Sequence, residues 1–332
     1  LRPEEGQPWR HALIALSHGG SDSDVTREFD LVAKRFVPPA EGGFERPDAK
    51  GTLSWIDADT VFVTTDFGPD TVSSSGYPLQ ARRWRRGTPM SEAEIVFQGD
   101  PADMQVGTDR EHDPGFVRDW VYQVRDFYDY DLLLLNPDGS LSLIEVPADC
   151  TAVPHRDLLL LTPRTDWEVD DVLVPAGSLA VAPLASFLPG WEGQGPRVKV
   201  LFSPSESTSI ADFFVTRNFI VVTAQEDVRH YLLTFYHDGD QWQSRRIHRD
   251  LPGSVWASAV DDVEGDELWI TATGFLQPPT LYLSDLAPLL DGQDPSPLVR
   301  MKAEPSHFDA AGLAVSQHFA ISDDGTRVPY FQ

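Results

Sequence analysis

The sequence predicts an all-β protein, and its strand rhythm favours a β-propeller. Short runs rich in Val, Ile, Phe, Tyr and Trp recur along the chain, separated by clusters of Gly, Pro, Asp and Asn. These runs group into units of about 40–50 residues, the period of a four-stranded propeller blade. A pair of large β-sandwiches is the competing architecture. We place six units near 8–37, 47–98, 103–148, 155–203, 210–250 and 254–302.

The individual strands are predicted from apolar runs bounded by turn residues. Two hairpins are also predicted, at Asn136-Pro-Asp-Gly139 and His237-Asp-Gly-Asp240, because Pro presets φ and Gly tolerates positive φ. Helical periodicity is nearly absent; only Ser284–Leu290 indicates a helical turn, which Pro288 limits. The clearest predicted strands are Ala12–Leu16, Thr60–Thr65, Trp120–Val124, Leu132–Asn136, Leu158–Thr162, Phe213–Val215, Phe219–Ala224, Tyr231–Tyr236, Glu267–Ala272 and Thr280–Leu283.

Composition excludes several classes of partner. The 332 residues carry 26 Lys and Arg against 52 Asp and Glu, a net charge of −26, so phosphate backbones and anionic membranes are repelled. No apolar run approaches the roughly 18 residues of a membrane span. The single cysteine, Cys150, cannot form an internal disulfide or a multi-Cys metal site. We expect a cytoplasmic protein; because the chain starts at Leu1, a removed leader stays open.

No motif within the chain predicts catalytic residues. The Gly-x-Ser-x-Gly elbow of α/β-hydrolases does not occur. Gly19-Gly-Ser21 superficially resembles a nucleophile turn, but Val25–Phe29, which follows it, has a strand pattern rather than a helical one. The nine His residues are scattered, and no metal site is assigned.

Three charged segments have alternative interpretations. The acidic loops Asp109–Asp113 and Asp261–Glu264 have oxygen ligands suited to calcium, but solvated loops are the favoured interpretation. The basic segment Arg82–Arg86 is interpreted as an outward strand edge guarded by charge, in preference to a docking site for an acidic partner.

Several segments resemble the prolyl oligopeptidase family of serine peptidases. Ser322-Asp-Asp-Gly-Thr-Arg-Val-Pro-Tyr-Phe331 is similar to the family pattern Ser-x-Asp-Gly-Thr-x-Ile/Val-Pro-x-Phe, the first hairpin of its α/β-hydrolase domain. Leu16-Ser-His-Gly-Gly-Ser-Asp22 and Lys50-Gly-Thr-Leu-Ser-Trp-Ile-Asp57 resemble early propeller blades. Gly274-Phe-Leu-Gln-Pro-Pro279 resembles a stretch of the last blade. The matches span most of the chain in the family's order.

The resemblance implies a seven-bladed propeller that covers a peptidase domain cleaving short peptides after proline. It implies a propeller over residues 1–303, and over residues 304–332 the connection and first hairpin of a peptidase domain. The catalytic triad of the family lies in that peptidase domain, so we expect this chain alone to be inactive and to need no cofactor. The implied partners are the missing peptidase domain and short proline-containing peptides. The sequence shows six blades, whereas the family has seven, so it does not decide how the propeller ring closes.

The resemblance also implies one substrate-contact site. Val124-Arg-Asp-Phe-Tyr128 follows a blade strand where family members carry an Arg facing the active site, so Arg125 and Tyr128 are the candidates. The alternative is a buried ion pair of Arg125 with Asp126 or Asp129. Two other functions stay open: a free-standing propeller hydrolase or lactonase with a metal at its central mouth, and a protein-interaction scaffold.

Overall fold

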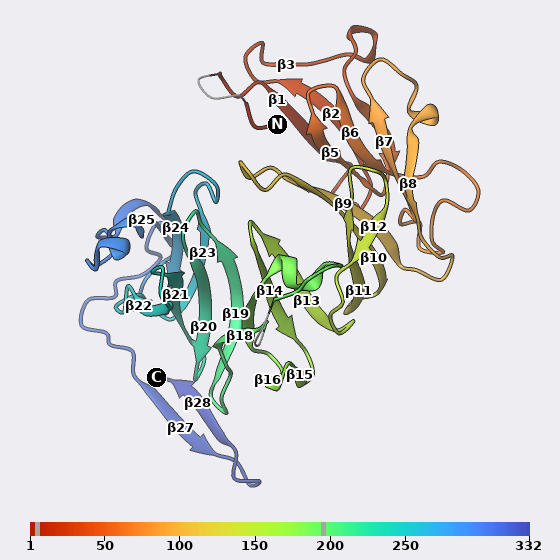
Figure 1. Cartoon of the computed structure of the whole chain (residues 1–332). Helices are drawn as coiled ribbons and strands as arrows, with labels where there is room; N and C mark the ends of the chain where they lie inside the picture. Colours follow the sequence, from red (N-terminus) through yellow and green to blue (C-terminus); the bar gives the residue numbers. More distant parts are fainter. Residues whose placement is uncertain (4–6, 194–196) are drawn as a thin grey trace. The chain divides into compact units, whose positions relative to one another are not determined.

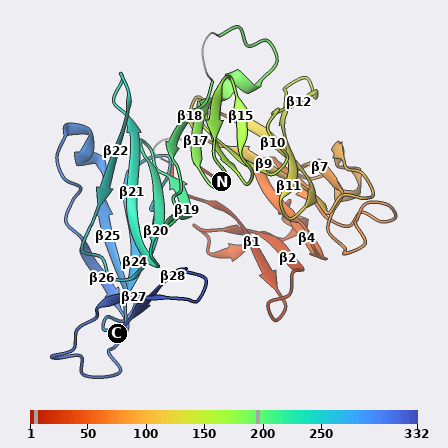
Figure 2. The ribbon, with the colours of Figure 1, turned by 90° about the horizontal axis from the view of Figure 1, so that it is seen from below.

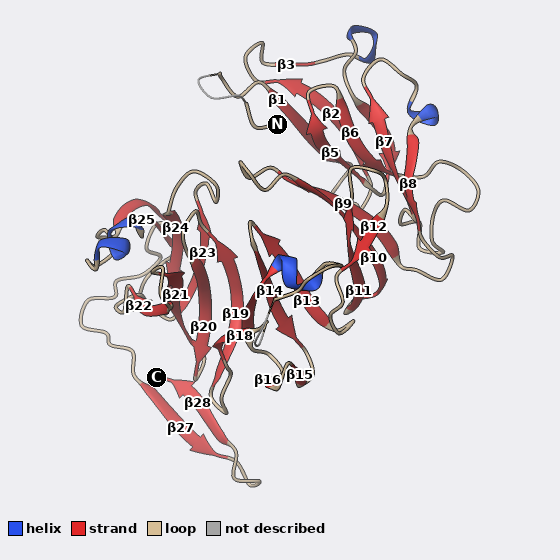
Figure 3. Cartoon of the chain, viewed as in Figure 1, coloured by secondary structure: helices blue, strands red, loops and turns tan. Residues whose placement is uncertain are grey.

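The computed structural model describes residues 1–3, 7–193 and 197–332, which form an almost purely β structure (Figure 1, Figure 3). Within these ranges no helix is long and apolar enough to cross a membrane. The chain divides into two compact units, Leu1–Leu161 with Ala182–Arg197, and Thr162–Val181 with Val198–Gln332. The helical segments described are short 3-10 turns: η1 (Pro39–Glu41), η2 (Met90–Glu92), η3 (Leu184–Phe187) and η4 (Ala287–Asp291).

Three antiparallel four-stranded sheets lie in the first unit. In the first of them β2 pairs with each of the other three strands, whereas the next two sheets have their strands in sequential order. The first sheet holds β1 (His11–Ser17), β2 (Asp24–Asp30), β3 (Arg35–Phe36) and β4 (Glu45–Ala49). The second holds β5 (Thr52–Asp57), β6 (Thr60–Thr64), β7 (Gln80–Arg85) and β8 (Glu94–Gln98). The third holds β9 (Gln105–Glu111), β10 (Arg118–Asp126), β11 (Asp129–Leu135) and β12 (Leu141–Leu143).

The fourth sheet is interrupted by a small hairpin of two strands. The boundary between the two units passes through β14 and β17 of this sheet. Its strands are β13 (Cys150–His155), β14 (Leu158–Pro163), β17 (Leu179–Pro183) and β18 (Lys199–Phe202), and the inserted hairpin is β15 (Trp167–Val169) with β16 (Val172–Val174).

Two further four-stranded sheets and a separate hairpin complete the second unit. Figure 2 shows β19 to β22 side by side. The fifth sheet holds β19 (Thr208–Val215), β20 (Ile220–Glu226), β21 (Arg229–His237) and β22 (Trp242–Ile247). The sixth holds β23 (Ser254–Ala259), β24 (Glu267–Thr273), β25 (Thr280–Asp285) and β26 (Val299–Ala303). The terminal hairpin pairs β27 (Gln317–Ile321) with β28 (Arg327–Phe331).

Six four-stranded sheets among the described residues confirm the predicted number of units, and every predicted strand lies in or overlaps an observed one. The first of these units was predicted too short, because β4 of its sheet lies beyond residue 37. Residues 194–196 of the fourth predicted unit lie outside the described residues. Both predicted hairpins form, with Gly139 at φ 85° and Gly239 at φ 102°, where a side chain would be strained. Within Ser284–Leu290 the helical turn is shorter than predicted, because β25 continues to Asp285.

Hydrophobic side chains are buried between neighbouring sheets within each unit. In the first unit, Phe62 and Ala81 of the second sheet pack with Val106, Val121 and Leu135 of the third. In the second unit, side chains of the fifth sheet pack with those of the sixth in one cluster. That cluster is Phe219, Val221, Leu232, Ile247, Val255, Leu268, Ile270, Ala272, Leu286 and Leu289. Burial of both faces of the inner strands explains their continuous apolar runs.

Candidate functional site

The candidate substrate contacts lie in the turn between β10 and β11. The register of this pair shifts between Val124 and Asp126, so Arg125 is the extra residue of a β-bulge, a device that redirects a side chain. Arg125 Nη1 donates to Asp129 Oδ1 at 2.8 Å, and Nη2 donates to Asp131. These hydrogen bonds, of which the one to Asp131 has the larger effect, raise the pKa of the guanidinium.

Arg125 therefore forms the ion pair that the sequence offered as the alternative, with two corrections. Asp131 takes the place predicted for Asp126, and the pair is partly exposed rather than buried. Two carboxylates already neutralise Arg125, so its remaining N–H donors suit a neutral carbonyl better than a second carboxylate. The substrate contact itself stays a prediction.

Two exposed aromatic residues follow this arginine in the chain. Tyr128 is 59% exposed and Phe127, which the sequence analysis did not select, is 80% exposed. Below them the hairpin is firmly held, because the Tyr130 hydroxyl accepts the backbone N–H of Ala152 at 2.7 Å. Burial raises the pKa of the Tyr122 and Tyr130 phenols. The turn therefore presents a paired guanidinium and two exposed aromatic rings above a hairpin held by that hydrogen bond.

The prediction that Asp109–Asp113 is a solvated loop is wrong: Asp109 and Glu111 lie in β9, and arginines pair with Glu111 and Asp113. Glu111 accepts Arg118 Nε at 2.9 Å and the Arg156 N–H at 2.7 Å, and Asp113 accepts Arg156 Nε at 3.0 Å. His112 Nε2 contacts the Trp55 carbonyl at 3.0 Å. Burial, opposed by these bonds, raises the pKa of Glu111. The cluster ties β9 and β10 to the β13–β14 turn.

Neither acidic loop gathers ligands for a cation. In the second loop, Asp261 Oδ1 accepts the backbone N–H groups of Val263 and Glu264, as in an ordinary turn. No group of three or more His, Cys, Asp or Glu side chains within residues 1–3, 7–193 and 197–332 is arranged to hold a metal ion.

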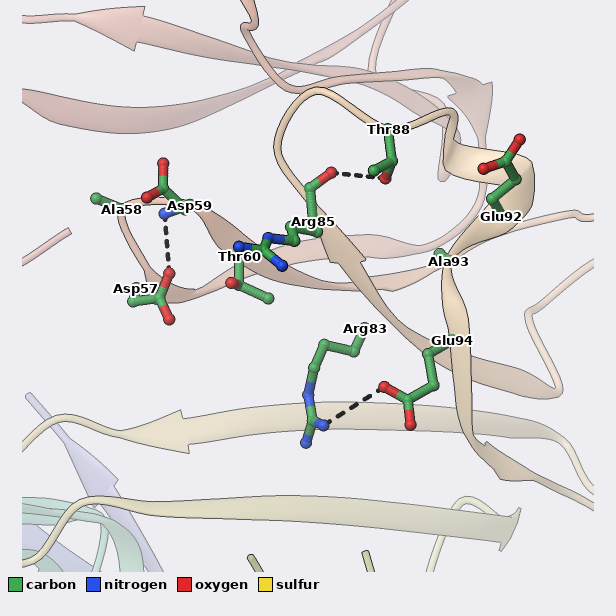
Figure 4. Close-up of a pocket in the computed structure, with 10 residues that line it drawn as sticks. All are labelled: Asp57, Ala58, Asp59, Thr60, Arg83, Arg85, Thr88, Glu92, Ala93 and Glu94. Carbon is green, nitrogen blue, oxygen red and sulfur yellow. Dashed lines mark hydrogen bonds and ion pairs between the residues drawn. The ribbon is translucent and has the colours of Figure 1, made fainter.

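A hollow of about 670 Å³ lies on the second sheet (Figure 4). It is lined by both charge signs, and Arg83 Nη1 lies 3.6 Å from Glu94 Oε2. The lining contains no Ser, Cys or His, and hence no pair of nucleophile and imidazole base. Its lining residues are Asp57, Ala58, Asp59, Thr60, Arg83, Arg85, Thr88, Glu92, Ala93 and Glu94.

The prediction that Arg82–Arg86 forms an outward sheet edge is wrong. Its strand, β7, pairs with β6 on one side and β8 on the other. Trp84 is buried, and its indole N–H donates to the Thr88 carbonyl at 2.9 Å. Arg86 Nη1 donates to the buried Glu28 at 2.7 Å. Because successive side chains of a strand point to opposite faces of the sheet, the arginines of this segment have separate partners and do not form one basic surface.

Two Ser–His contacts exist among the described residues, and neither forms a hydrolytic site. Ser284 Oγ donates to the Ser296 carbonyl at 2.9 Å, so His248 Nε2, at 2.8 Å, donates to Ser284 and cannot accept its proton. Ser284 is also buried. Ser316 Oγ lies 2.9 Å from His318 Nε2 on an exposed hairpin, with no carboxylate recorded on that imidazole within the described ranges. The hydroxyl of Ser21 hydrogen-bonds only to Ser23 among the described residues.

Comparison with known proteins identifies relatives along almost the whole chain. No family model matches it. The uncharacterized peptidase y4nA of Sinorhizobium fredii is 31% identical over 96% of this chain and 43% of its own length. A post-proline cleaving enzyme from Rickettsia typhi superposes with a TM-score of 0.82 at 25% identity, over 97% of this chain and 47% of that enzyme. Over almost its whole length, the chain therefore resembles the propeller part of prolyl-oligopeptidase-type peptidases.

The six four-stranded antiparallel sheets, together with this likeness, confirm the predicted β-propeller class. Prolyl oligopeptidase B from Galerina marginata has the same fold, with a TM-score of 0.65 at 16% identity over 97% of this chain and 44% of that protein. This chain thus spans less than half the length of the relatives that it matches.

Proposed function

We propose that this chain is the propeller domain of a prolyl-oligopeptidase-like serine peptidase, and that it controls which peptides reach a separate catalytic domain. The observation that carries the proposal is the superposition, over 97% of the chain, on a post-proline cleaving enzyme about twice as long. The proposed partners are that catalytic domain and short proline-containing peptides. Cytoplasmic location is part of the proposal, supported by the single buried cysteine, which forms no internal disulfide.

Within this proposal, the Arg125 turn contacts the peptide backbone. Asp129 and Asp131 fix the guanidinium and neutralise it, and a peptide carbonyl then accepts one of its remaining N–H groups. Phe127 and Tyr128 supply exposed rings on which an apolar side chain packs. This arrangement recognises peptides without selecting a particular sequence, which suits an access domain better than a catalytic one.

The first experiment measures hydrolysis of succinyl-Gly-Pro-p-nitroanilide by the purified chain. No turnover is expected, since neither Ser–His contact combines an accessible serine with an imidazole base held by a carboxylate. Turnover that a serine-directed fluorophosphonate abolishes would contradict the proposal.

The second experiment joins this chain to the catalytic portion of the Rickettsia typhi enzyme, in place of that enzyme's own propeller. The chimera is expected to cleave short proline peptides and to spare a folded protein with an exposed Pro-containing loop. Arg125→Ala should raise KM about three- to tenfold with little change in kcat, as expected for loss of about one hydrogen bond. Arg35→Ala is the control, because it removes another exposed arginine, paired with Glu41 at 2.7 Å. Equal effects of the two substitutions would refute the assigned contact.

A further inference from the structure

A second pocket, of about 440 Å³, lies in the second unit among the fifth sheet, the sixth sheet and the terminal hairpin. This volume falls within the range of about 300–1,000 Å³ typical of small-molecule sites. None of its lining residues is acidic, although acidic residues outnumber basic ones 52 to 26 in the chain. The lining is Arg229, His230, Arg246, Arg249, Leu251, Pro252, Gly253, Gly274, Phe275, Leu276, Gln277, Val315 and Phe331.

Three arginines give the pocket its positive charge. The side chains of Arg229 and Arg249 have no ion pair or hydrogen bond among the residues that the structure describes. Arg246 Nη1 lies 3.6 Å from Glu226, its guanidinium stacks on the Tyr231 ring at 4.0 Å, and its Nε is buried without a partner. In a chain with this excess of carboxylates, arginines without a carboxylate partner mark a place where an anion can bind.

Part of the pocket lining is apolar. Phe275 of the β24–β25 loop and Phe331 of β28 contact each other, with ring centroids 5.3 Å apart. Phe275 is 67% exposed, and the Arg229 guanidinium lies 5.4 Å from the Phe331 ring. A Cβ added at Gly274 would lie 3.1 Å from Pro252 Cβ, so glycine keeps the floor close-packed. A ligand here meets both guanidinium groups and aromatic rings.

We propose that this pocket binds a carboxylate joined to an apolar group, as in the C-terminal residue of a peptide. A guanidinium matches a carboxylate through two parallel N–H···O bonds, and Arg229 and Arg249 have those donors available. The aromatic wall accepts the apolar side chain of the same residue. A phosphate uses the arginines but leaves the aromatic wall without a contact, so the carboxylate is favoured. This site is distinct from the Arg125 turn, whose guanidinium is already neutralised, and it does not depend on the proposed function.

The test uses isothermal titration calorimetry on the 332-residue chain. Three ligands are titrated separately: N-acetyl-Ala-Phe as the free acid, the same dipeptide with a C-terminal amide, and phenyl phosphate. The free acid should bind about ten- to a hundredfold more tightly than the amide, as expected for loss of a charge-assisted hydrogen bond. Arg249→Gln and Arg229→Gln should each weaken the free acid by a similar factor and leave the amide unchanged. Neither side chain has a bonded partner within the described ranges, so both variants should fold.

Arg245→Gln is the matched control. It removes the same charge from β22 at the position next to Arg246, but Arg245 pairs with Asp294 outside the pocket. Binding of the free acid should be unchanged in this variant. Equal binding of acid and amide, no binding of the acid, tighter binding of phenyl phosphate, or an equal loss in Arg245→Gln would each overturn the assignment.

Discussion

Replacing Glu28 with Gln is expected to destabilise the first unit more than any change to a surface ion pair. Glu28 is 1% exposed, and its carboxylate accepts Arg86 Nη1 at 2.7 Å, His11 Nδ1 at 2.9 Å and the Phe44 N–H at 3.1 Å. Glutamine keeps the shape but removes the buried anion, leaves Arg86 only the exposed Asp59 carboxylate at 3.3 Å from its Nε, and turns an NH₂ donor toward other donors. Breaking a buried pair on one side costs about 3–5 kcal/mol.

Hydrogen exchange of backbone amides is the appropriate assay, because it assigns stability to particular strands. A loss of about 3–5 kcal/mol corresponds to exchange about 10²- to 10³-fold faster or more, if β2 exchanges through opening of the unit. Glu41→Gln is the control, since it breaks an exposed pair with Arg35 at 2.7 Å, worth about 0–1 kcal/mol. The reasoning fails if the β2 amides of Glu28→Gln lose less than about 1 kcal/mol of protection, which is no more than the loss expected in the control.

Three further outcomes test the packing and electrostatics of the first unit. Burial alone would raise the pKa of Glu28, but hydrogen bonds from Arg86, Phe44 and His11 outweigh it and lower this pKa. The ionised Glu28 should therefore stabilise the fold fully above its unfolded pKa of about 4.3, and this stabilisation should disappear as pH falls through the lower folded pKa. Acid titrations of unfolding should show this pH dependence in the wild-type chain and not in Glu28→Gln. Trp84→Ala should cost about 3–5 kcal/mol in urea unfolding, whereas Trp256→Ala, at 57% exposure, should stay within about 0.5 kcal/mol; similar losses would contradict the burial argument. Gly51→Ala should lower the thermal midpoint, because the new Cβ would lie 2.0 Å from the Thr64 carbonyl oxygen; an unchanged midpoint would show that the backbone relaxes freely.

Local sequence features predicted most of the strands, because strand formation here follows apolar runs and turn chemistry. β10 and β11 contain long apolar runs, and the Asn136–Gly139 turn has the residues that its backbone requires. The six-unit rhythm was visible for the same reason: each sheet repeats the same order of strand and turn.

Side-chain partners far apart in the sequence were not predictable in this way. Arg86 appeared to belong to a basic strand edge because its partner, Glu28, lies 58 residues away. Arg125 pairs with Asp131 instead of Asp126 because a bulge changes the direction of its side chain. The carboxylate pocket was missed because its arginines and aromatic residues are scattered between Arg229 and Phe331, with no shared motif.

The terminal hairpin is fastened to its unit by few polar contacts. Gln317 Nε2 donates to the Asp227 carbonyl at 2.6 Å, and Arg327 lies 4.0 Å from the Asp227 carboxylate. This two-stranded ribbon is also held by Phe331, whose ring lies 5.3 Å from that of Phe275 and 5.4 Å from the Arg229 guanidinium. Because Phe331 of this ribbon forms part of the pocket wall, any molecule that fills the pocket must also slow the ribbon's detachment. The rate of hydrogen exchange at the β28 amides would then report the fraction of the protein whose pocket holds a ligand.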